Sequence, residues 1–483
     1  MRLSDLLSRA GIAGPQGSSR LDQKIASITR DSRRVDESAV FVAIRGASVD
    51  GHDLVGGLGP CAAVVAERPV PTDAPLVLVE DTRHALAALA AALHGAPSES
   101  MRVVGLTGTN GKTTTAEQID AMLRHDGVGW RCGRIGTLGA SIDGVPHPSS
   151  LTTPEAPALQ ALLAHMRDGG LQAVAMEVSS IGLHQRRVDS TRFHVGVFTG
   201  LTRDHLGFHG TMEAYARAKA RLFTDLLRPA GGLPRALLCG DDPSWTRMQP
   251  PADRWLYGVG PGCDARLEGL ACGPRGLQFE LHTPVGSAQV RSPLLGRHNA
   301  LNVAAAVTAG VLLGAELQAC AAAVAEGPIV RGRLETVPND RGVLVAVDYA
   351  HTPDALAAAL GAVRDLVPGR SILVFGCGGD RDAGKRPQMG EVARRLADVV
   401  VVTSDNPRSE DPLQIIADIL QGTSESVHSV VDREEAIALA LELAEEGDAV
   451  LIAGKGHETT QAFRDRTVPF DDRAVARGIL EGR

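Results

Sequence analysis

The chain has 483 residues, and 49 Lys and Arg against 57 Asp and Glu give it a formal net charge of -8. This acidic balance argues against a dedicated nucleic-acid-binding protein, which would carry a basic excess. Hydrophobic residues make up 44% of the chain and charged residues 22%, so most of it can bury enough apolar surface to fold. Because domains usually have ~100–200 residues, we expect about two to four of them.

Membrane insertion and secretion are not expected. The longest apolar runs, such as residues 303–314, are shorter than the ~20 residues that span a bilayer. Residues 1–5 lack the apolar stretch of a signal peptide. The 7 cysteines include no Cys-x-x-Cys pair, which favours reduced thiols over a disulfide framework or a zinc site. We therefore expect a cytoplasmic protein with no membrane span and no nucleic-acid partner.

Residues 1–98 are expected to form a first domain. Short apolar runs predict buried strands at 40–44 and 63–66, and an Ala-rich stretch predicts a helix at 86–93. Residues 94–100 (HGAPSES) interrupt these patterns and are interpreted as a linker.

Residues 99–328 alternate between strand and helix patterns, which predicts a mostly parallel sheet with helices on both faces. The expected strands cover residues 102–107, 173–178 and 195–199, and each is followed by polar residues. Because ligands bind outside the carboxyl ends of such strands, we expect the site there.

Residues 329–483 repeat the α/β pattern as a third domain. A helix is expected at 354–367, and polar residues or glycines again follow the strands. The expected strands cover residues 343–347, 371–375, 399–403 and 449–453. The predicted fold class is therefore α/β throughout.

A phosphate-binding loop is the strongest local signal. Residues 105–115 (GLTGTNGKTTT) follow a strand and open a helix, as such a loop requires, although Leu106 stands where a strict Walker A motif has glycine. Backbone N–H groups and the helix N-terminus would hold phosphates, Lys112 would reach the β- and γ-phosphates, and the Thr113 hydroxyl would ligate Mg²⁺. The alternative is a Gly-rich turn with an incidental lysine. The candidate ATP contacts are Gly108, Thr109, Asn110, Gly111, Lys112, Thr113 and Thr114.

Two further positions suggest a metal site. Glu177 and His205 follow neighbouring predicted strands and could hold a cation, since Mg²⁺ needs few protein ligands. A surface ion pair is the alternative. Lys219 lies in an expected helix at 211–223, and its spacing alone favours a solvated charge.

Taken together, nine short motifs resemble those of the Mur ligases, the ATP-dependent peptide ligases of peptidoglycan precursor synthesis. The resemblance covers nearly the whole chain. The motifs are residues 108–114 (GTNGKTT), 152–154 (TTP), 176–180 (MEVSS), 203–206 (RDHL), 298–302 (HNALN), 348–353 (DYAHTP), 376–382 (GCGGDRD), 405–408 (DNPR) and 453–458 (AGKGHE).

The resemblance implies a three-domain architecture, with a P-loop ATPase-like parallel sheet in the centre and a Rossmann-like C-terminal domain. Residues 1–98 would bind UDP-MurNAc-dipeptide, residues 99–328 ATP, and residues 329–483 the incoming amino acid. The implied reaction joins meso-2,6-diaminopimelate to the D-Glu of UDP-MurNAc-L-Ala-D-Glu through an acyl phosphate, with Mg²⁺ and ATP, in a monomer.

The resemblance also implies roles for single residues. Lys112, Lys219 and His205 would be catalytic, with Lys219 converted to a carbamate. The expected metal ligands are Thr113, Glu177, His205 and the Lys219 carbamate. Asn299 and Asn302 would lie near the adenine. The UDP-MurNAc-dipeptide would contact Ser32, Thr152, Thr153, Ser179, Gln185 and Arg187. Diaminopimelate would contact Arg381, Asp405, Asn406, Pro407, Arg408, Gly454 and Glu458.

Arg408 is the expected selector of the amine. A guanidinium can hold the distal carboxylate of diaminopimelate with two hydrogen bonds, and Asp405 or Asn406 can take its ammonium. Lysine has no such carboxylate. Seen alone, the four residues 405–408 would equally form an Asx-Pro turn closed by an ion pair.

Three positions depart from the family pattern. Ile181 stands where the family often has His, Gly200 where it often has Asn, and Gly207 where it often has Asp. The metal site is therefore expected to lack the Asn and Asp side chains that often support it in the family, while its candidate ligands are present.

Other activities are alternatives to this one. The same chemistry with another amine would give a lysine-adding ligase or a folylpolyglutamate-synthase-like enzyme, and the arginine of DNPR and the long first domain argue against these. A P-loop switch or motor ATPase would leave the motifs of residues 329–483 unexplained.

Overall fold

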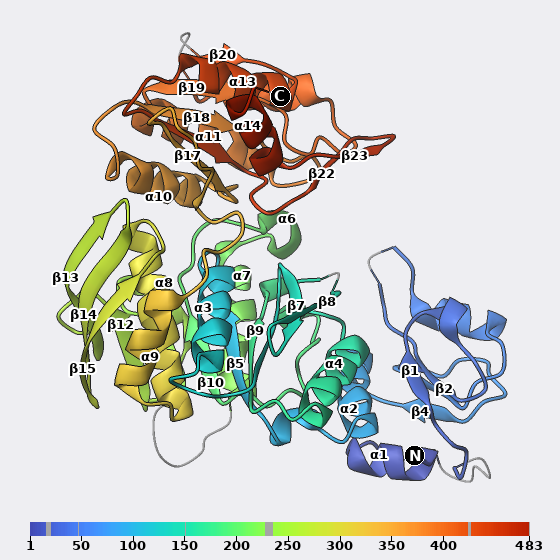
Figure 1. Cartoon of the computed structure of the whole chain (residues 1–483). Helices are drawn as coiled ribbons and strands as arrows, with labels where there is room; N and C mark the ends of the chain where they lie inside the picture. The colour runs from blue at the N-terminus through green and yellow to red at the C-terminus, as the bar shows by residue number, and fades with distance from the viewer. Residues whose placement is uncertain (16–20, 47, 150, 228–234, 424–426, 483) are drawn as a thin grey trace.

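The computed structural model covers residues 1–483 and describes all of them except 16–20, 47, 150, 228–234, 424–426 and 483. Three α/β units follow one another along the chain (Figure 1). The first is drawn in blue, the second runs from cyan to yellow, and the third is orange to red. In the described part of the chain, no helix is long and apolar enough to cross a membrane.

The first unit is a parallel sheet of four strands in the order β1-β2-β3-β4. The expected strands at 40–44 and 63–66 are present, and the helix begins at Thr82 because the Asp81 carboxylate caps the N–H groups of Arg83 and His84. Its elements are α1 (Leu3–Arg9), β1 (Ser27–Thr29), η1 (Ser32–Arg34), β2 (Ala39–Val42), η2 (Gly51–Gly57), β3 (Ala63–Ala66), β4 (Leu76–Leu78), α2 (Thr82–Leu93) and η3 (Pro97–Glu99).

The second unit is built on a sheet of eleven strands in the order β15-β14-β13-β12-β11-β10-β5-β9-β6-β7-β8. Its middle, from β12 to β6, is parallel as expected, and both edges are antiparallel hairpins that were not predicted from the sequence. Its strands are β5 (Arg102–Thr107), β6 (Cys132–Gly136), β7 (Gly139–Ile142), β8 (Val145–His147), β9 (Ala173–Glu177), β10 (Val195–Phe198), β11 (Ala236–Cys239), β12 (Arg254–Gly258), β13 (Ala265–Gly273), β14 (Gly276–Thr283) and β15 (Gly286–Ser292).

Helices cover both faces of this sheet. α8 is buried along almost its whole length against α3 and strands β10 to β14, so its alanines serve close packing. The expected helix at 211–223 ends in its regular form at Arg221 and continues as one π-helical turn, Leu222–Leu226. The helices are α3 (Lys112–Arg124), α4 (Ala156–Asp168), α5 (Ser180–His184), α6 (Leu206–His209), α7 (Met212–Arg221), α8 (Arg297–Leu313) and α9 (Leu317–Ala323), with short 3₁₀ helices at Pro243–Met248 and Val324–Glu326.

The third unit has a six-stranded sheet in the order β16-β17-β21-β18-β19-β20, parallel except for β16. The four expected strands are all present within one residue at each end. Its elements are β16 (Glu335–Thr336), β17 (Leu344–Asp348), α10 (Pro353–Arg364), β18 (Ser371–Phe375), η7 (Ala383–Lys385), α11 (Arg386–Leu396), β19 (Val399–Val402), α12 (Pro412–Leu420), β20 (His428–Ser429), α13 (Arg433–Leu443), β21 (Ala449–Ala453), β22 (Thr460–Ala462), β23 (Thr467–Pro469) and α14 (Asp472–Leu480).

One histidine connects neighbouring strands of the central sheet. His194 Nδ1 accepts a hydrogen bond from the Val103 N–H at 3.1 Å, and burial together with nearby arginines lowers the pKa of His194 to about 4. The ring must therefore be neutral for this contact. Since the unfolded chain holds the proton more tightly, folded stability is lost as pH falls from about 6.5 toward 4.

We predict that His194→Asn reduces this loss, because Asn Oδ1 can accept the same hydrogen bond without titrating. Between pH 7 and pH 5 the wild type should lose about 2 kcal/mol more unfolding free energy than the variant. Urea unfolding at both pH values measures the difference. Exposed His428→Asn is the control and should behave as the wild type. Identical pH dependence of all three proteins would contradict the prediction.

Candidate active site

The phosphate loop lies between β5 and α3, and side chains from other segments lie very close to its glycines. Gly108 has φ of 151° and Gly111 φ of 84°, in the region that favours glycine. A Cβ on Gly108 would lie 2.0 Å from Thr199 Oγ1, and one on Gly111 would lie 2.5 Å from Asn302 Oδ1. Both glycines are thus required by space as well as by conformation.

Lys112 is folded over this loop. Its Nζ donates hydrogen bonds to the carbonyl oxygens of Gly108 at 2.9 Å and Thr109 at 2.8 Å. Burial lowers the pKa of Lys112, and the nearby carboxylate of Glu177 partly opposes that effect. The lysine is therefore placed at the loop that would surround a phosphate chain.

Glu177 ends β9 and holds the segments that follow the two neighbouring strands, β5 and β6. The carboxylate is 1% exposed and accepts hydrogen bonds from Thr113 Oγ1 at 3.0 Å and from the Thr137 N–H and Oγ1 at 2.8 and 3.2 Å. Thr137 was not predicted from the sequence, because Arg134 interrupts the apolar pattern of β6, the strand that ends at Gly136.

Lys219 is buried, not solvated. It is 1% exposed, and its Nζ donates to the Gly108 carbonyl at 2.7 Å and lies 4.6 Å from the centre of the Tyr215 ring. Burial, assisted by the positive charge of Lys112, lowers the pKa of Lys219 well below its usual value. An amine in this state loses its proton readily and becomes a nucleophile.

His205 and Asp204 face the third unit. His205 has φ of 54°, and its Nε2 lies 3.4 Å from Asp204 Oδ2, which is also 3.8 Å from Nε2 of His351. Burial would raise the pKa of Asp204, but the nearby imidazoles of His351 and His205 lower it below its ordinary range. Burial lowers the pKa of His205 to about 4. The pair is a carboxylate beside a neutral imidazole at pH 7.

The donors at this place fit a hard cation better than a transition metal. Within the described residues, no group of three or more His, Cys, Asp or Glu side chains could hold a metal ion. The buried oxygens of Glu177 and Thr113 face each other instead, and oxygen is what Mg²⁺ prefers while it keeps several waters. The remaining ligands would have to come from the substrate, from water or from a modified lysine.

The two predicted asparagines stand at the N-terminus of α8. Asn302 Nδ2 donates to Asn299 Oδ1 at 2.9 Å, and Asn302 Oδ1 lies against Gly111, as described above. Asn299 Nδ2 donates to the Leu295 carbonyl at 2.8 Å. Both side chains are buried, so the helix start is fixed beside the phosphate loop.

The residues expected to hold the dipeptide form one network with Glu177. Thr153 Oγ1 donates to the Glu177 carbonyl at 2.9 Å and accepts from the Ser179 N–H at 3.0 Å. Arg187 binds the Thr153 carbonyl at 2.8 Å and Gln185 Oε1 at 2.7 Å. Thr152 Oγ1 is 3.1 Å from the Thr137 hydroxyl that reaches Glu177.

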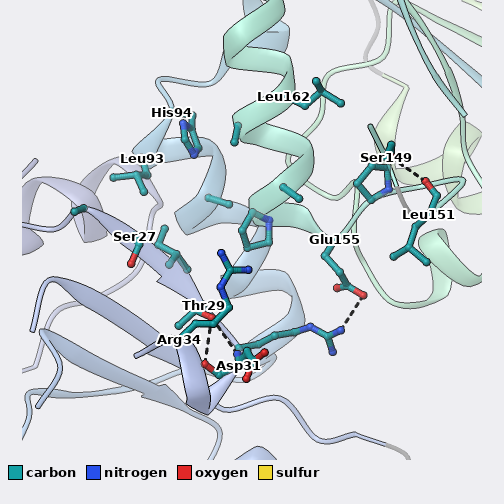
Figure 2. Close-up of a pocket in the computed structure, with 18 of the residues that line it drawn as sticks. Ser27, Thr29, Asp31, Arg34, Leu93, His94, Ser149, Leu151, Glu155 and Leu162 are labelled. Atoms are coloured by element: carbon teal, nitrogen blue, oxygen red, sulfur yellow. Dashed lines mark hydrogen bonds and ion pairs between the residues drawn. The ribbon is translucent and has the colours of Figure 1, made fainter. Parts of the chain in front are cut away.

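Ser32 lies apart from these groups, on the wall of a cavity of about 1350 Å³ between the first unit and α4. Figure 2 shows Thr29, Asp31 and Arg34 on one side of this cavity and Glu155 opposite them. Arg30 spans the gap, since its Nη2 is 3.1 Å from Glu155 Oε1. The cavity is large enough for a nucleotide-sized ligand.

The residues expected to bind diaminopimelate converge in the third unit, after β19 and β21. Asn406 Nδ2 donates to Asp405 Oδ1 at 3.2 Å and to Glu458 Oε2 at 2.7 Å. Lys455, which is fully buried and was not predicted as a site residue, donates to Asn406 Oδ1 at 3.2 Å and to Glu458 Oε2 at 3.3 Å. Burial raises the pKa of Asp405 against the opposing charge of Arg433. The cluster mixes both signs of charge, as a zwitterionic ligand requires.

Arg408 and Arg381 border this cluster. Arg408 has φ of 53°, and its Nη1 donates to the Gly379 carbonyl at 2.7 Å. Arg381 is exposed and binds only the neighbouring Asp380 carbonyl at 3.0 Å among the interactions described. Pro407 begins the turn that contains Arg408, since the Pro407 carbonyl accepts from the Glu410 N–H at 3.1 Å. Gly454 has φ of 112°, and Asp405 Oδ2 lies 3.2 Å from where a Cβ on Gly454 would be.

One residue of the third unit reaches the phosphate loop. Arg333 Nη2 donates to Thr113 Oγ1 at 3.3 Å, and its guanidinium lies 4.8 Å from the centre of the Tyr349 ring. Arg333 was not predicted from the sequence, because it follows no predicted strand and belongs to none of the nine motifs. It brings a cation from the third unit to the triphosphate side of the site.

Two of the three departures have a structural explanation. Gly200 has φ of 128°, and its carbonyl accepts from the Thr109 N–H at 2.8 Å, while Asp242 Oδ2 accepts from the next N–H, that of Leu201, at 2.6 Å. The backbone and Asp242 therefore support this loop. A Cβ on Gly207 would meet no atom within 4 Å, so an acidic side chain there would extend into open space. Nothing in the structure explains Ile181.

Comparison with known proteins identifies the family. Residues 106–310 match the family model of the Mur ligase middle domain, and residues 332–456 match that of the Mur ligase, glutamate ligase domain. A UDP-N-acetylmuramoyl-L-alanyl-D-glutamate–2,6-diaminopimelate ligase of Geobacillus kaustophilus is 45% identical over 468 residues, which cover 95% of each chain. The chain belongs to the Mur ligase family.

Further relatives agree with this assignment. A ligase of the same name from Thermosynechococcus vestitus is 43% identical over 496 residues, covering 100% of this chain and 98% of that protein. A solved structure with that name has a TM-score of 0.72 at 33% identity and covers 100% of this chain and 99% of its own. MurF of Thermotoga maritima in complex with ADP has a TM-score of 0.64 at 23% identity, covering 96% and 100%, and shows the shared fold.

The predicted Mur ligase membership, α/β architecture and ligase activity are thus confirmed. The boundaries at residues 98 and 328, the single-residue roles, the monomeric state and the cytoplasmic location stay predictions.

We predict that Gly108→Ala weakens nucleotide binding by at least about tenfold, because the Cβ would collide with Thr199 Oγ1 and displace the loop. Calorimetric titration with a non-hydrolysable ATP analogue measures the effect. The control is Gly207→Ala, where the added methyl meets no atom within 4 Å. Equal affinities of the two variants would show that this loop does not hold the nucleotide.

Proposed function

We propose that the protein joins meso-2,6-diaminopimelate to the D-Glu of UDP-MurNAc-L-Ala-D-Glu, with ATP converted to ADP and phosphate. The observation that carries the proposal is the set of contacts that join the phosphate loop, the network around Glu177 and the third unit. Thr113 links the helix after the phosphate loop to Glu177, and the third unit, which carries the cluster at Asp405, contacts this part of the central unit through Arg333 and Asp382. The names of full-length relatives at 43–45% identity support the same activity.

In the first step, the γ-carboxylate of D-Glu attacks the γ-phosphate of ATP, giving an acyl phosphate and ADP. Two anions must approach each other, so cations have to neutralise the charge that develops. Lys112 is bound to the loop carbonyls at 2.8–2.9 Å, and Arg333 of the third unit reaches the Thr113 hydroxyl at 3.3 Å. We infer that both would turn to the phosphates when ATP binds.

In the second step, the amine of the incoming amino acid attacks the acyl carbon, the C–O bond to phosphate breaks, and the amine loses a proton. The chain supplies no covalent nucleophile in this scheme; it supplies position. The Thr153–Ser179–Arg187 network would hold the muramoyl dipeptide next to Glu177, and the third unit would bring in the amine.

Thr113, Glu177, His205 and a carbamate on Lys219 would hold Mg²⁺. The ion would supply positive charge to the transferring phosphoryl group. The carbamate forms when the neutral amine adds to CO₂ and releases a proton, which turns a buried amine into an anionic oxygen ligand. The lowered pKa of Lys219 and its contact with Gly108 support this assignment.

Arg408 is proposed to select the amine. Its guanidinium lies at the border of a cluster whose carboxylates and amide can bind an ammonium. The distal carboxylate of diaminopimelate would therefore contact Arg408, and the ammonium beside it would contact the cluster. Lysine would leave the arginine without a partner. The relatives' names favour diaminopimelate over lysine, and the folylpolyglutamate synthases among the structural neighbours, at 19–20% identity, share the fold alone.

We predict strong preference for meso-diaminopimelate over L-lysine when purified protein is incubated with ATP, Mg²⁺ and UDP-MurNAc-L-Ala-D-Glu. Arg408→Lys should lower kcat/KM for diaminopimelate about 10- to 100-fold, because the two-pronged contact is lost. Release of ADP, followed with each amine, measures both. Equal turnover of the two amines by the wild type would refute the specificity, and ADP release without any amine or dipeptide would indicate a motor-type ATPase.

We predict that Lys219→Ala lowers kcat by about 10²- to 10³-fold, since an anionic ligand of the metal is removed. Short carboxylates added to the assay should restore part of the activity by occupying the vacated space. Arg217→Ala, on the exposed side of the same helix, is the matched control and should retain wild-type kcat. Unchanged activity of Lys219→Ala would rule out the carbamate.

A further inference from the structure

An ion pair joins the two units at the level of the site and involves neither the proposed substrate contacts nor the proposed metal ligands. Arg203 Nε donates to Asp382 Oδ2 at 3.2 Å. Arg203 directly precedes Asp204 and His205, in the loop after β10. Asp382 directly follows Arg381, a proposed diaminopimelate contact. The pair thus connects the loop of the metal side with the loop of the amine side.

The Asp382 end of this contact is well defined. The side chain is 14% exposed, and its Oδ1 accepts a hydrogen bond from the Gly384 N–H at 2.9 Å, which orients Oδ2 toward Arg203. A Cβ on Gly384 would lie 2.8 Å from Arg203 Nη2. The guanidinium therefore lies across the turn that follows Asp382, in space that a glycine leaves open.

Four hydrogen bonds join the loop that carries Asp382 to residues 406–409. The Gly379 N–H donates to the Asn406 carbonyl at 2.9 Å, and the Gly379 carbonyl accepts from Arg408 Nη1 at 2.7 Å. Asp380 accepts from the Ser409 N–H at 3.3 Å and from Ser409 Oγ at 2.5 Å. A change at Asn406 or Arg408 therefore acts directly on Gly379, three residues before Asp382.

Arg203 is followed directly by Asp204 and His205, which contact each other. Asp204 Oδ1 accepts from the His205 N–H at 2.8 Å, and Asp204 Oδ2 lies 3.4 Å from His205 Nε2. His205 is held with φ of 54°, so a shift of the preceding residue changes the direction of its imidazole. The connection from Arg408 to His205 runs through a hydrogen bond to Gly379, along the backbone to Asp382, across the Arg203–Asp382 pair and along the backbone to His205.

We propose that Arg203 and Asp382 are positioning residues that make the placement of the Asp204–His205 loop depend on an occupied amine site. Holding diaminopimelate fixes residues 378–382, Asp382 then fixes Arg203, and Arg203 fixes the loop that bears His205. The benefit is that the phosphoryl group is transferred efficiently only when a nucleophile is ready to receive the acyl group. This inference rests on the proposed function.

The chain provides a matched control at the same boundary. Arg297 Nε and Asp365 Oδ2 form a second ion pair between the two units, at 3.5 Å, joining α8 to the end of α10. Its side chains are 72% and 52% exposed, and no described interaction links Asp365 to either loop. Asp365→Asn therefore removes an ion pair between the two units without changing the Arg203–Asp382 pair.

The experiment compares the full-length wild type, Asp382→Asn and Asp365→Asn, varying ATP, UDP-MurNAc-L-Ala-D-Glu and meso-diaminopimelate one at a time. Asn keeps an oxygen for the Gly384 N–H, so the turn is retained. We expect Asp382→Asn to raise KM for diaminopimelate and lower kcat, each by about tenfold, with the other two KM values changed by less than about twofold. Asp365→Asn should match the wild type. Equal behaviour of the two variants, or a uniform rise of all three KM values, would overturn the proposal.

Arg203→Gln and the double variant complete the test. If the residues act through each other, the double variant is no more impaired than the worse single variant. If the fold losses in activity of the two single variants multiply in the double variant, Arg203 and Asp382 act independently and the proposal is refuted. A wild type that forms no tripeptide with diaminopimelate would instead refute the proposed function, so the two failures are distinguishable.

Discussion

A buried carboxylate, Glu177, is the constraint on which the site depends. At 1% exposure it would be strongly destabilising without partners, and hydroxyl and N–H groups of Thr113 and Thr137 provide them. Those partners come from the helix after the phosphate loop and from the turn after β6, and the Glu177 carbonyl also holds Thr153. One ionisable group thus fixes the relative positions of the helix after the phosphate loop, the turn after β6 and Thr153.

Burial also determines the charge states around this carboxylate. Lys219 is so poorly solvated that its ammonium form is disfavoured, and His205 has its pKa lowered to about 4 for the same reason. Asp204 stays ionised because imidazoles from both units surround it. A lysine amine and an imidazole that give up protons easily, beside the carboxylates of Glu177 and Asp204, leave lone pairs free for a divalent cation.

The sequence was sufficient for the elements that depend on local patterns. Apolar runs of β-branched residues predicted the inner parallel strands, and the three polar strand ends proved to be neighbours because β10, β5 and β9 are adjacent in the sheet. The antiparallel edge strands β13 to β15 were missed, since their exposed positions weaken the apolar pattern. The phosphate loop needed only glycines and a lysine at a fixed spacing.

Contacts between segments far apart in the sequence could not be predicted. Arg333 and Thr137 belong to the site only because the chain folds back on itself, and the burial of Lys219 depends on Tyr215 and Gly108 meeting in space. The interpretation of Lys219 as a solvated charge was the natural result of spacing alone. The resemblance to a family supplied the information that local patterns lacked.

Two residues at the site, His205 and Arg408, adopt left-handed backbone angles that are unfavourable for any side chain with a Cβ. Glycine would relax the backbone at both places, and a search for thermostable variants guided by conformational preference alone would choose it there. Such variants would gain resistance to heat while losing the imidazole and the guanidinium. At His205 and Arg408, the backbone conformation that would be most stable and the side chain that the chemistry needs therefore call for different residues.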